Sequence, residues 1–173
     1  ERNFTSYKND LLQANVAVSV TKTSTPITER WSSTTEIQWS GKKPEGKVNI
    51  ERIYIDENFC STAGLTILKG RDMNLNTFPS DSTSVLLNES AVKAMNFENP
   101  IGEVIIDNGT EWHVIGVVKD FILTSPYQKV EPLVLMGSKA KWALQFVHIK
   151  LDPSNAPKAS MSKLAELWTK YNP

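Results

Sequence analysis

Cysteine, histidine and long apolar runs are scarce in this sequence, and each scarcity excludes a class of protein. A single cysteine, Cys60, rules out an internal disulfide framework. No stretch approaches the ~18 consecutive apolar residues of a membrane-spanning helix, so no segment is predicted to cross a bilayer. The 19 basic residues equal the 19 acidic ones in number. This balance argues against binding of nucleic acid or of anionic lipid headgroups.

The motifs of common enzyme classes are also missing. The sequence has neither the Gly-x-Ser-x-Gly turn of a hydrolase nor the glycine-rich loop of a P-loop nucleotide site. Its two histidines, His113 and His148, have no second histidine or cysteine at metal-ligand spacing. Cys60 lies in an apolar stretch without an evident base, which favours packing as a small hydrophobe. The sequence therefore predicts no metal or cofactor site.

Asp120 is the strongest lone carboxylate candidate, because it closely follows the apolar run 114–118. At a strand end, a carboxylate commonly accepts hydrogen bonds from backbone amides and shapes the turn. Acid–base catalysis is the alternative, but it ordinarily needs a second group at a fixed position. We therefore expect a structural role for Asp120.

The two ends of the sequence look like cuts in a longer protein. Glu1 takes the place of an initiating methionine, no signal peptide follows it, and the last residues come just after a helical pattern. A chain of 173 residues suits one domain or two small lobes that share a core. We expect an excised region of a larger protein.

In the first third of the chain, apolar spacing predicts a helix followed by strands. Residues 3–12 have helical spacing, and residues 16–20 alternate as in a half-buried strand. Strand character returns at residues 48–55. There the apolar phase slips between Ile50 and Ile53, and one extra residue in the strand, a β-bulge, would account for the slip.

Three local signals mark the middle of the chain. Asn88 can cap a short helix by accepting hydrogen bonds from its free amides. Residues 99–102 have proline second and glycine fourth, which predicts a type I turn. Asn108 and Gly109 form the strongest short-range hairpin signal of the sequence, with strands expected on both sides.

The last part of the chain is predicted to form a strand at 146–151 and a helix that begins at Ser154 or Asn155, with Pro157 in its first turn. One helix face is apolar and is expected to contact a sheet, and it consists of Met161, Leu164, Ala165 and Trp168. Strands and helices intermix without strict alternation, which is typical of an α+β fold.

Five tryptophans are consistent with a sugar-binding platform or with ordinary packing. Two of them lie on predicted elements, Trp112 on the strand after the hairpin turn and Trp168 on the C-terminal helix. The other three, Trp31, Trp39 and Trp142, lie in or near loops, where an exposed aromatic ring can anchor a partner. Packing is the favoured interpretation. Within the loop-rich residues 21–45, Trp31 and Trp39 are the candidates for partner binding.

Three runs of residues carry a resemblance to a known family. They are residues 59–73, residues 85–102 with Asn-Glu-Ser-Ala at 88–91, and residues 114–121 with Val-Ile-Gly-Val-Val-Lys-Asp-Phe. In order and spacing they resemble the MacB-like periplasmic core domain of bacterial ABC transporter permeases of the MacB/FtsX type. The second and third runs are the most specific parts.

The resemblance implies a non-catalytic domain without a cofactor, on the periplasmic side of the bacterial inner membrane. It implies adjoining transmembrane helices, a cytoplasmic ATPase and a permease dimer. It also implies ATP-driven motion that reaches a periplasmic partner or cargo, as in efflux or in lipoprotein or peptide export. For the fold it implies two lobes, and we expect a porter-like lobe of residues 1–56 and 124–173 with a smaller inserted lobe of residues 57–123.

Two other classes of protein stay open. One is the ectodomain of a signalling or adhesion protein with a single membrane anchor. The other is a stand-alone periplasmic hydrolase or sugar-binding protein that uses Asp120 and the loop tryptophans. The transporter interpretation leads because the three runs occur together and in order.

Overall fold

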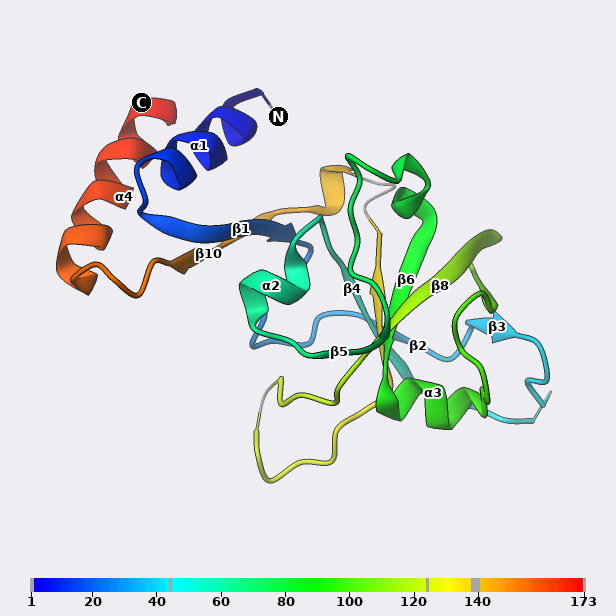
Figure 1. Ribbon diagram of the computed structural model, residues 1–173. Coiled ribbons are helices and arrows are strands. Elements are labelled where there is room, and N and C mark those ends of the chain that lie inside the picture. Colours follow the sequence, from blue (N-terminus) through cyan, green and yellow to red (C-terminus); the bar gives the residue numbers. More distant parts are fainter. Residues whose placement is uncertain (1, 44, 124, 138–140, 173) are drawn as a thin grey trace.

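The computed structural model describes residues 2–43, 45–123, 125–137 and 141–172 (Figure 1). Helices and strands intermix along the chain, which confirms the predicted α+β fold. In chain order the elements are α1 (Arg2–Gln13), β1 (Ala17–Thr23), β2 (Ser33–Thr34), β3 (Gln38–Trp39), β4 (Ile50–Tyr54), α2 (Phe59–Ala63), β5 (Ile67–Gly70), η1 (Pro79–Thr83), β6 (Ser84–Asn88), α3 (Glu89–Met95), β7 (Val104–Asp107), β8 (Thr110–Val118), β9 (Leu133–Met136), η2 (Lys141–Ala143), β10 (Phe146–Leu151) and α4 (Pro157–Tyr171).

The two ends of the chain build one lobe, here called the terminal lobe (residues 2–23 and 146–172). Strands β1 and β10 pair antiparallel as a two-stranded sheet, and α1 and α4 pack together beside it (Figure 1). A two-stranded sheet is marginally stable by itself and needs such cover. The buried core of this lobe consists of Tyr7, Leu11, Val16, Ala17, Val20 and Leu167.

Helix α4 presents a face to this core that agrees only in part with the predicted one. Leu164 packs against the core as predicted. Leu167 and Ser160 are 7% and 3% exposed, whereas Met161 and Trp168 are 56% and 48% exposed. The prediction was wrong for Met161, because it followed the apolar residues alone. In the structure α4 also contacts α1, where the ring of Trp168 packs edge-on against Tyr7 with centroids 5.6 Å apart.

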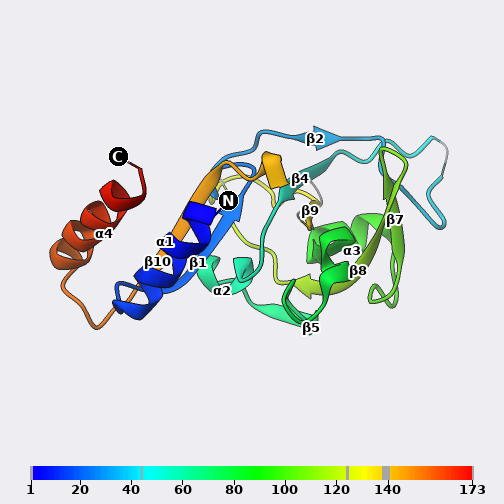
Figure 2. The same ribbon diagram turned by 90° about the horizontal axis from the view of Figure 1, so that it is seen from above.

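The middle of the chain builds a second lobe, here called the sheet lobe (residues 33–137). Its strands are ordered β2-β4-β9-β6-β8-β7-β3, and β5 pairs with β8 beside this path. The Arg52 guanidinium of β4 lies 2.8 Å from the Asp107 carboxylate of β7, although three strands separate β4 from β7. The sheet must therefore curl on itself, as seen from above in Figure 2.

Both faces of the curled sheet are covered. Helix α3 contributes Ala91 and Met95 to the core on one face, and α2 contributes Phe59 and Cys60 to the core on the other. This arrangement explains β4, whose Ile50 belongs to the first core and whose Ile53 belongs to the second. The predicted bulge was wrong, because β4 pairs with β9 in unbroken register.

Local signals elsewhere gave mixed results. The Asn88 side chain accepts a hydrogen bond from the Ala91 N–H at 2.9 Å, and Asn108 and Gly109 join β7 to β8 with φ of 49° and 71°, so both predictions are confirmed. The turn predicted at 99–102 forms one residue later, because Gly102 adopts φ 91° and the Glu103 N–H donates to the Pro100 carbonyl.

The predicted cap of α4 was also wrong. The N-cap residue is Ala156, without a side-chain hydrogen bond. Ser154 instead donates from its hydroxyl and its amide to the Asp152 carboxylate. The Asn155 amide donates to the Asn15 carbonyl at 2.6 Å. Both candidate caps are therefore engaged in holding the loop before the helix.

The expected lobe boundaries at residues 57 and 123 stay a prediction. Strands β4 and β9 belong to the outer segments of that prediction, and they pair with each other and, through β9, with β6 of the inserted segment. Within the described part of the chain, no helix combines the length and apolar character needed to cross a membrane.

Candidate functional site at the junction of the two lobes

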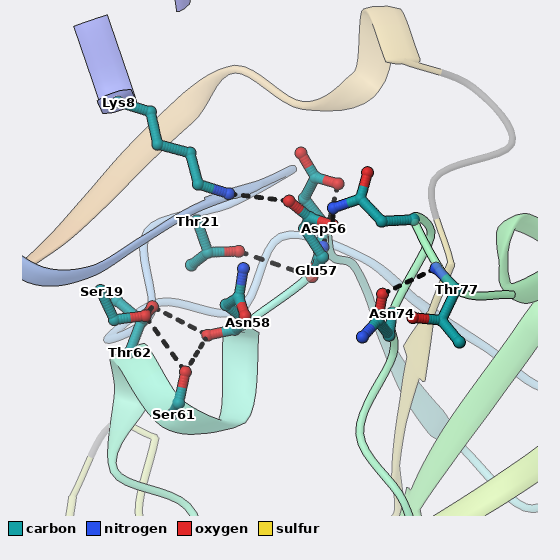
Figure 3. Close-up of polar contacts among 11 residues, drawn as sticks. Lys8, Ser19, Thr21, Asp56, Glu57, Asn58, Ser61, Thr62, Asn74 and Thr77 are labelled. Atoms are coloured by element: carbon teal, nitrogen blue, oxygen red, sulfur yellow. Dashed lines mark hydrogen bonds and ion pairs between the residues drawn. The ribbon is translucent and has the colours of Figure 1, made fainter. Parts of the chain in front are cut away.

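The two lobes meet where β1 and β10 lie against α2 and the turn that precedes it (Figure 3). Backbone hydrogen bonds cross this junction. The Asp56 N–H donates to the Lys22 carbonyl at 3.0 Å, the Ser24 N–H donates to the Tyr54 carbonyl at 2.9 Å, and Thr23 forms a bridge with Ile55. The last residue of β4 and the two residues after it are thereby fixed to the end of β1 and the residue that follows it.

Several side-chain contacts across the junction are polar. The Lys8 ammonium of α1 lies 2.8 Å from the Glu57 carboxylate, whose second oxygen accepts from the Asn76 amide at 3.0 Å. The Ser19 hydroxyl of β1 lies 2.7 Å from the Thr62 hydroxyl and 3.1 Å from the Ser61 hydroxyl of α2 (Figure 3). Hydroxyl and ionic contacts of this kind can be exchanged for water at small net cost.

The α2 hydroxyls are oriented by the backbone of Asn58. Asn58 has φ 63°, a left-handed conformation that asparagine tolerates, and it directs its carbonyl to α2. The Thr62 and Ser61 hydroxyls both donate to this carbonyl, at 2.8 and 2.9 Å. Because the Thr62 proton is used there, the Ser19 hydroxyl must donate to Thr62 Oγ1.

A cavity of about 260 Å³ lies between the two lobes. It is partly apolar and partly polar, and it is lined by Thr21, Ile27, Phe59, Thr62, Ala63, His148 and Ile149. An apolar cavity of about 150 Å³ is already large enough to hold benzene. This one is open to solvent, so it is a cleft at the surface of the junction large enough to admit a small molecule.

Two ionisable groups at the junction, of which His148 lines the cavity, are partly desolvated. Burial lowers the pKa of His148, so its ring is neutral near pH 7. Thr23 Oγ1 donates to the Thr25 carbonyl at 2.5 Å, so His148 Nε2, 2.7 Å from Thr23 Oγ1, must donate to it. Burial likewise raises the pKa of Asp56. The hydrogen bond that its carboxylate accepts from the Glu57 N–H lowers this pKa and offsets part of the rise.

The three loop tryptophans are not among the junction residues described above. Trp31 is 56% exposed, donates to the Glu29 carboxylate at 2.6 Å, and packs edge-on against Phe146. Trp39 is half-buried against the core under α3. Trp142 is 82% exposed. None of these observations tests their role in partner binding.

The residues considered from the sequence for catalysis or metal binding have surroundings typical of structural roles. The Asp120 carboxylate accepts from the Ser90 amide at 3.0 Å and from the Ser90 hydroxyl at 2.6 Å, the strand-end role expected for it. Burial raises the pKa of the Cys60 thiol, so the thiol is protonated and unreactive at neutral pH. His113 is exposed on β8. Across the described ranges, no three His, Cys, Asp or Glu side chains are grouped as metal ligands.

The junction residues themselves were missed from the sequence. Ser19, Thr62 and Glu57 carry no motif, and the contacts that join them to the other lobe link residues more than 40 positions apart. The one available signal was the polar turn 56–58 before an apolar stretch.

Comparisons with known proteins agree in one family. The family model described as the MacB-like periplasmic core domain matches residues 2–167. The macrolide export ATP-binding/permease protein MacB of Aggregatibacter actinomycetemcomitans is 33% identical over 96 residues, which are 49% of this chain and 15% of that protein. The chain thus matches a small part of that relative's length.

Three solved structures share the fold. The periplasmic region of MacB from Actinobacillus actinomycetemcomitans is 23% identical with a TM-score of 0.66, covering 97% of this chain and 74% of that one. The extracellular domain of the noncanonic ABC-type transporter YknZ from Gram-positive bacteria is 14% identical with a TM-score of 0.65, covering 96% and 82%. A domain of a permease protein from Porphyromonas gingivalis is 13% identical with a TM-score of 0.61, covering 94% and 75%.

Proposed function

The chain belongs to the MacB-like periplasmic core domain family, and on this premise we propose that it is the extracytoplasmic domain of an ABC transporter permease. In this proposal the domain has no catalytic activity. It receives motion driven by a cytoplasmic ATPase and passes it to a partner or cargo in the periplasm. The cargo class is efflux substrate, lipoprotein or peptide.

The observation that carries the proposal is the junction between two lobes with separate cores, where polar contacts surround an open cleft. The terminal lobe has its own buried cluster, distinct from the two clusters of the sheet lobe. A lobe with its own core can move as a rigid body while its surface contacts exchange. Lys8, Ser19 and Thr62 supply contacts that can be broken and remade without exposing apolar core.

The geometry of the terminal lobe supports an input of motion at its helix ends. The Asn3 side chain donates to the Tyr171 carbonyl at 3.2 Å, so α1 begins where α4 ends. At the other end of the pair, the Asn155 side chain contacts the Asn15 carbonyl. The two helices are therefore antiparallel, and segments attached to both would leave the lobe at the same end. We propose that these segments lead to the permease's own transmembrane helices, at the periplasmic face of the inner membrane, in a permease dimer.

A reversible cross-link tests the proposal in the full-length transporter. Ser19→Cys and Thr62→Cys replace two hydroxyls 2.7 Å apart, a separation that suits a disulfide. Cys60→Ala is added to both so that the native thiol of this domain does not compete. We expect oxidation to stop transport and a reductant to restore it, because the lobes can no longer move relative to each other.

The matched control is the Ser19→Cys variant without its partner cysteine, which should transport equally well with and without oxidant. Mass spectrometry of the transporter verifies that the disulfide has formed. Normal transport by a fully cross-linked protein would overturn the proposed transmission through the junction.

We also propose that the stretch 21–45 faces the partner through Trp31 and Trp39. The exposed ring of Trp31 supports this more than the half-buried ring of Trp39 does. Trp31→Ala should weaken partner binding and transport together in the full-length protein, with Trp142→Ala, another exposed tryptophan, as the control. Unchanged binding and transport in Trp31→Ala and Trp39→Ala would remove this assignment.

A further inference from the structure

The cleft at the junction has walls from both lobes. Its lining combines side chains of the paired strands β1 and β10 with side chains of α2, and includes Thr21, His148, Ile149, Phe59, Thr62 and Ala63. The volume of about 260 Å³ exceeds the ~150 Å³ that is enough for benzene. A molecule somewhat larger than benzene can therefore contact both lobes at once.

The lining carries no charge near pH 7. Among the described residues that line the cleft, only His148 has an ionisable side chain, and burial lowers the pKa of its ring. The apolar part of the lining comes from Ile27, Phe59, Ala63 and Ile149. An ion buried there would lack a partner of opposite charge, which is costly. The part of a molecule that enters the cleft is therefore expected to be uncharged and mostly apolar.

The polar side chains of the cleft already use their own hydrogens. The Thr62 hydroxyl donates to the Asn58 carbonyl at 2.8 Å (Figure 3). The Thr21 hydroxyl donates to the Asp56 carbonyl at 3.5 Å. The single N–H of the neutral His148 ring is likewise used at the end of β1. The cleft therefore offers lone pairs rather than free hydrogens, so a bound molecule must be the donor.

The second nitrogen of the His148 ring is the most available of these acceptors. In a neutral ring with its proton on Nε2, Nδ1 holds a lone pair, and the described residues supply no donor to it. Thr62 Oγ1, by contrast, already accepts from the Ser19 hydroxyl at 2.7 Å. Thr21 is only 1% exposed. His148 Nδ1 is therefore the acceptor left for a bound molecule.

We propose that the junction cleft binds a small uncharged molecule with an apolar body and one N–H or O–H group. The N–H or O–H group donates to His148 Nδ1, and the apolar body packs against Phe59 of α2 and Ile149 of β10. Such a molecule links the two lobes. This inference rests on the chemistry of the cleft, and binding is measured without transport, so its failure and the failure of the proposed transmission are distinguishable.

Indole is the probe, because it has an apolar body and a single N–H. It is titrated into this chain and followed by ¹⁵N amide chemical shifts. We expect saturable shifts in β1, β10 and α2 at millimolar concentration or below. Benzofuran is the matched control, since it has the same shape with an oxygen in place of the N–H. It should bind about fivefold more weakly, because one hydrogen bond is lost.

The ¹⁵N resonances of the His148 ring give an independent readout. We expect a neutral ring with its proton on Nε2 before the titration. Indole should displace the Nδ1 resonance, and benzofuran should not. His148→Phe keeps an aromatic ring but removes the acceptor, so it should equalise the affinities for indole and benzofuran. This ratio of affinities is insensitive to a change in the stability of the variant.

A variant that fills the cleft locates the site. Ala63→Phe places a larger side chain in the lining and should abolish indole binding. The matched control is Ala159→Phe, at an exposed position of α4, which should bind indole like the parent chain. The amide spectrum verifies that both variants are folded.

Several results would overturn the inference. They are shifts confined to other surfaces, equal binding of indole and benzofuran by the parent chain, a proton on Nδ1 of the free His148 ring, or undiminished binding by folded Ala63→Phe. A preference for indole that persists in His148→Phe would also overturn it, and so would the absence of binding at millimolar concentration.

Discussion

The terminal lobe packs two helices beside a two-stranded sheet, whereas the sheet lobe covers both faces of a curled eight-stranded sheet. One lobe thus has a single apolar cluster and the other has two. Their mutual contacts are hydroxyl, ionic and backbone hydrogen bonds around a cavity. We therefore expect the free energy that stabilises each lobe internally to exceed the free energy that holds the two lobes together.

The largest expected effect comes from opening a cavity in either core. Leu11 of the terminal lobe and Leu86 of the sheet lobe are both fully buried, so Leu→Ala should cost about 3 kcal/mol in each. If the lobes are separately cohesive, Leu11→Ala lowers the urea midpoint reported by Trp168 and leaves the midpoint reported by Trp112 unchanged. Variants that retain one tryptophan each report the two lobes by fluorescence.

Leu86→Ala is the reciprocal control, since it should lower the midpoint reported by Trp112. A common shift of both reporters in Leu11→Ala would mean that the chain unfolds as one unit. The contrast between the lobes would then be limited to their architecture.

The ion pair inside the sheet lobe should have the next largest effect. Asp81 is fully buried, and its carboxylate binds the Arg71 guanidinium at 2.6 and 2.7 Å and the Asn74 N–H at 2.8 Å. Asp81→Asn should cost about 2 kcal/mol in urea unfolding at pH 7, because it removes hydrogen bonds to a charged group. Glu111→Gln, at an exposed carboxylate of β8, should leave the midpoint near its original value, and an equal loss in both variants would contradict the prediction.

Asp81 also sets a pH dependence. Burial alone would raise its pKa, but the hydrogen bonds from Arg71 and Asn74 outweigh burial and lower it below the ordinary 3.8. A lowered pKa in the folded state means that this stabilisation is present above pH 3.8 and is lost as pH falls below it. Acid unfolding followed by circular dichroism should therefore be less steep below pH 3.8 in Asp81→Asn.

A smaller effect is expected at the junction itself. The Lys8 and Glu57 side chains are 15% and 19% exposed. A double-mutant cycle with Lys8→Met and Glu57→Gln should give a coupling of about 1 kcal/mol that weakens with added salt. The exposed pair Lys163 and Glu166 is the control and should give a coupling close to zero. A coupling of several kcal/mol would contradict the expectation that interactions between the lobes are weaker than interactions within them.

The smallest effect should have the opposite sign. Burial raises the pKa of Asp56 at the junction, so the folded protein holds this proton more tightly than the unfolded chain does. The contribution of Asp56 to the free energy of unfolding therefore increases as pH falls from the raised pKa towards 3.8. This pH range lies above the range in which Asp81 contributes. Asp56→Asn should remove that rise in melting temperature and leave stability at pH 7 equal or slightly higher. A lower melting temperature at pH 7 would show that the carboxylate is needed in its charged form.

Two signals that act within a few residues were read correctly from the sequence, although the local turn at 99–102 and the cap of α4 were not. The Asn108-Gly109 turn and the Asn88 cap are both local, because the backbone conformation and the hydrogen-bond partner lie within three residues. The fold class and the family also followed from ordered local runs. Such features depend little on the rest of the molecule.

Features that depend on distant residues were not predicted. The face of α4 is chosen by contact with α1, which brings Leu167 rather than Trp168 into the core. The slip in β4 arises because both faces of the sheet are covered, so Ile50 and Ile53 pack in different cores. The junction requires Ser19 to meet Thr62, which apolar periodicity in the sequence cannot indicate.

The pairing of β1 with β10 has a consequence for the order in which the protein is made. Thr23 and His148, which share a hydrogen bond, are 125 residues apart. At a synthesis rate of about 5–20 residues per second, α1 and β1 wait for their partners for roughly 6–25 s after they leave the ribosome. The sheet lobe can close in that interval, because its strands lie between them in the chain. The lobe proposed to receive motion is therefore the last to be completed, and until then the apolar residues of α1 and β1 lack the strand and helix against which they pack.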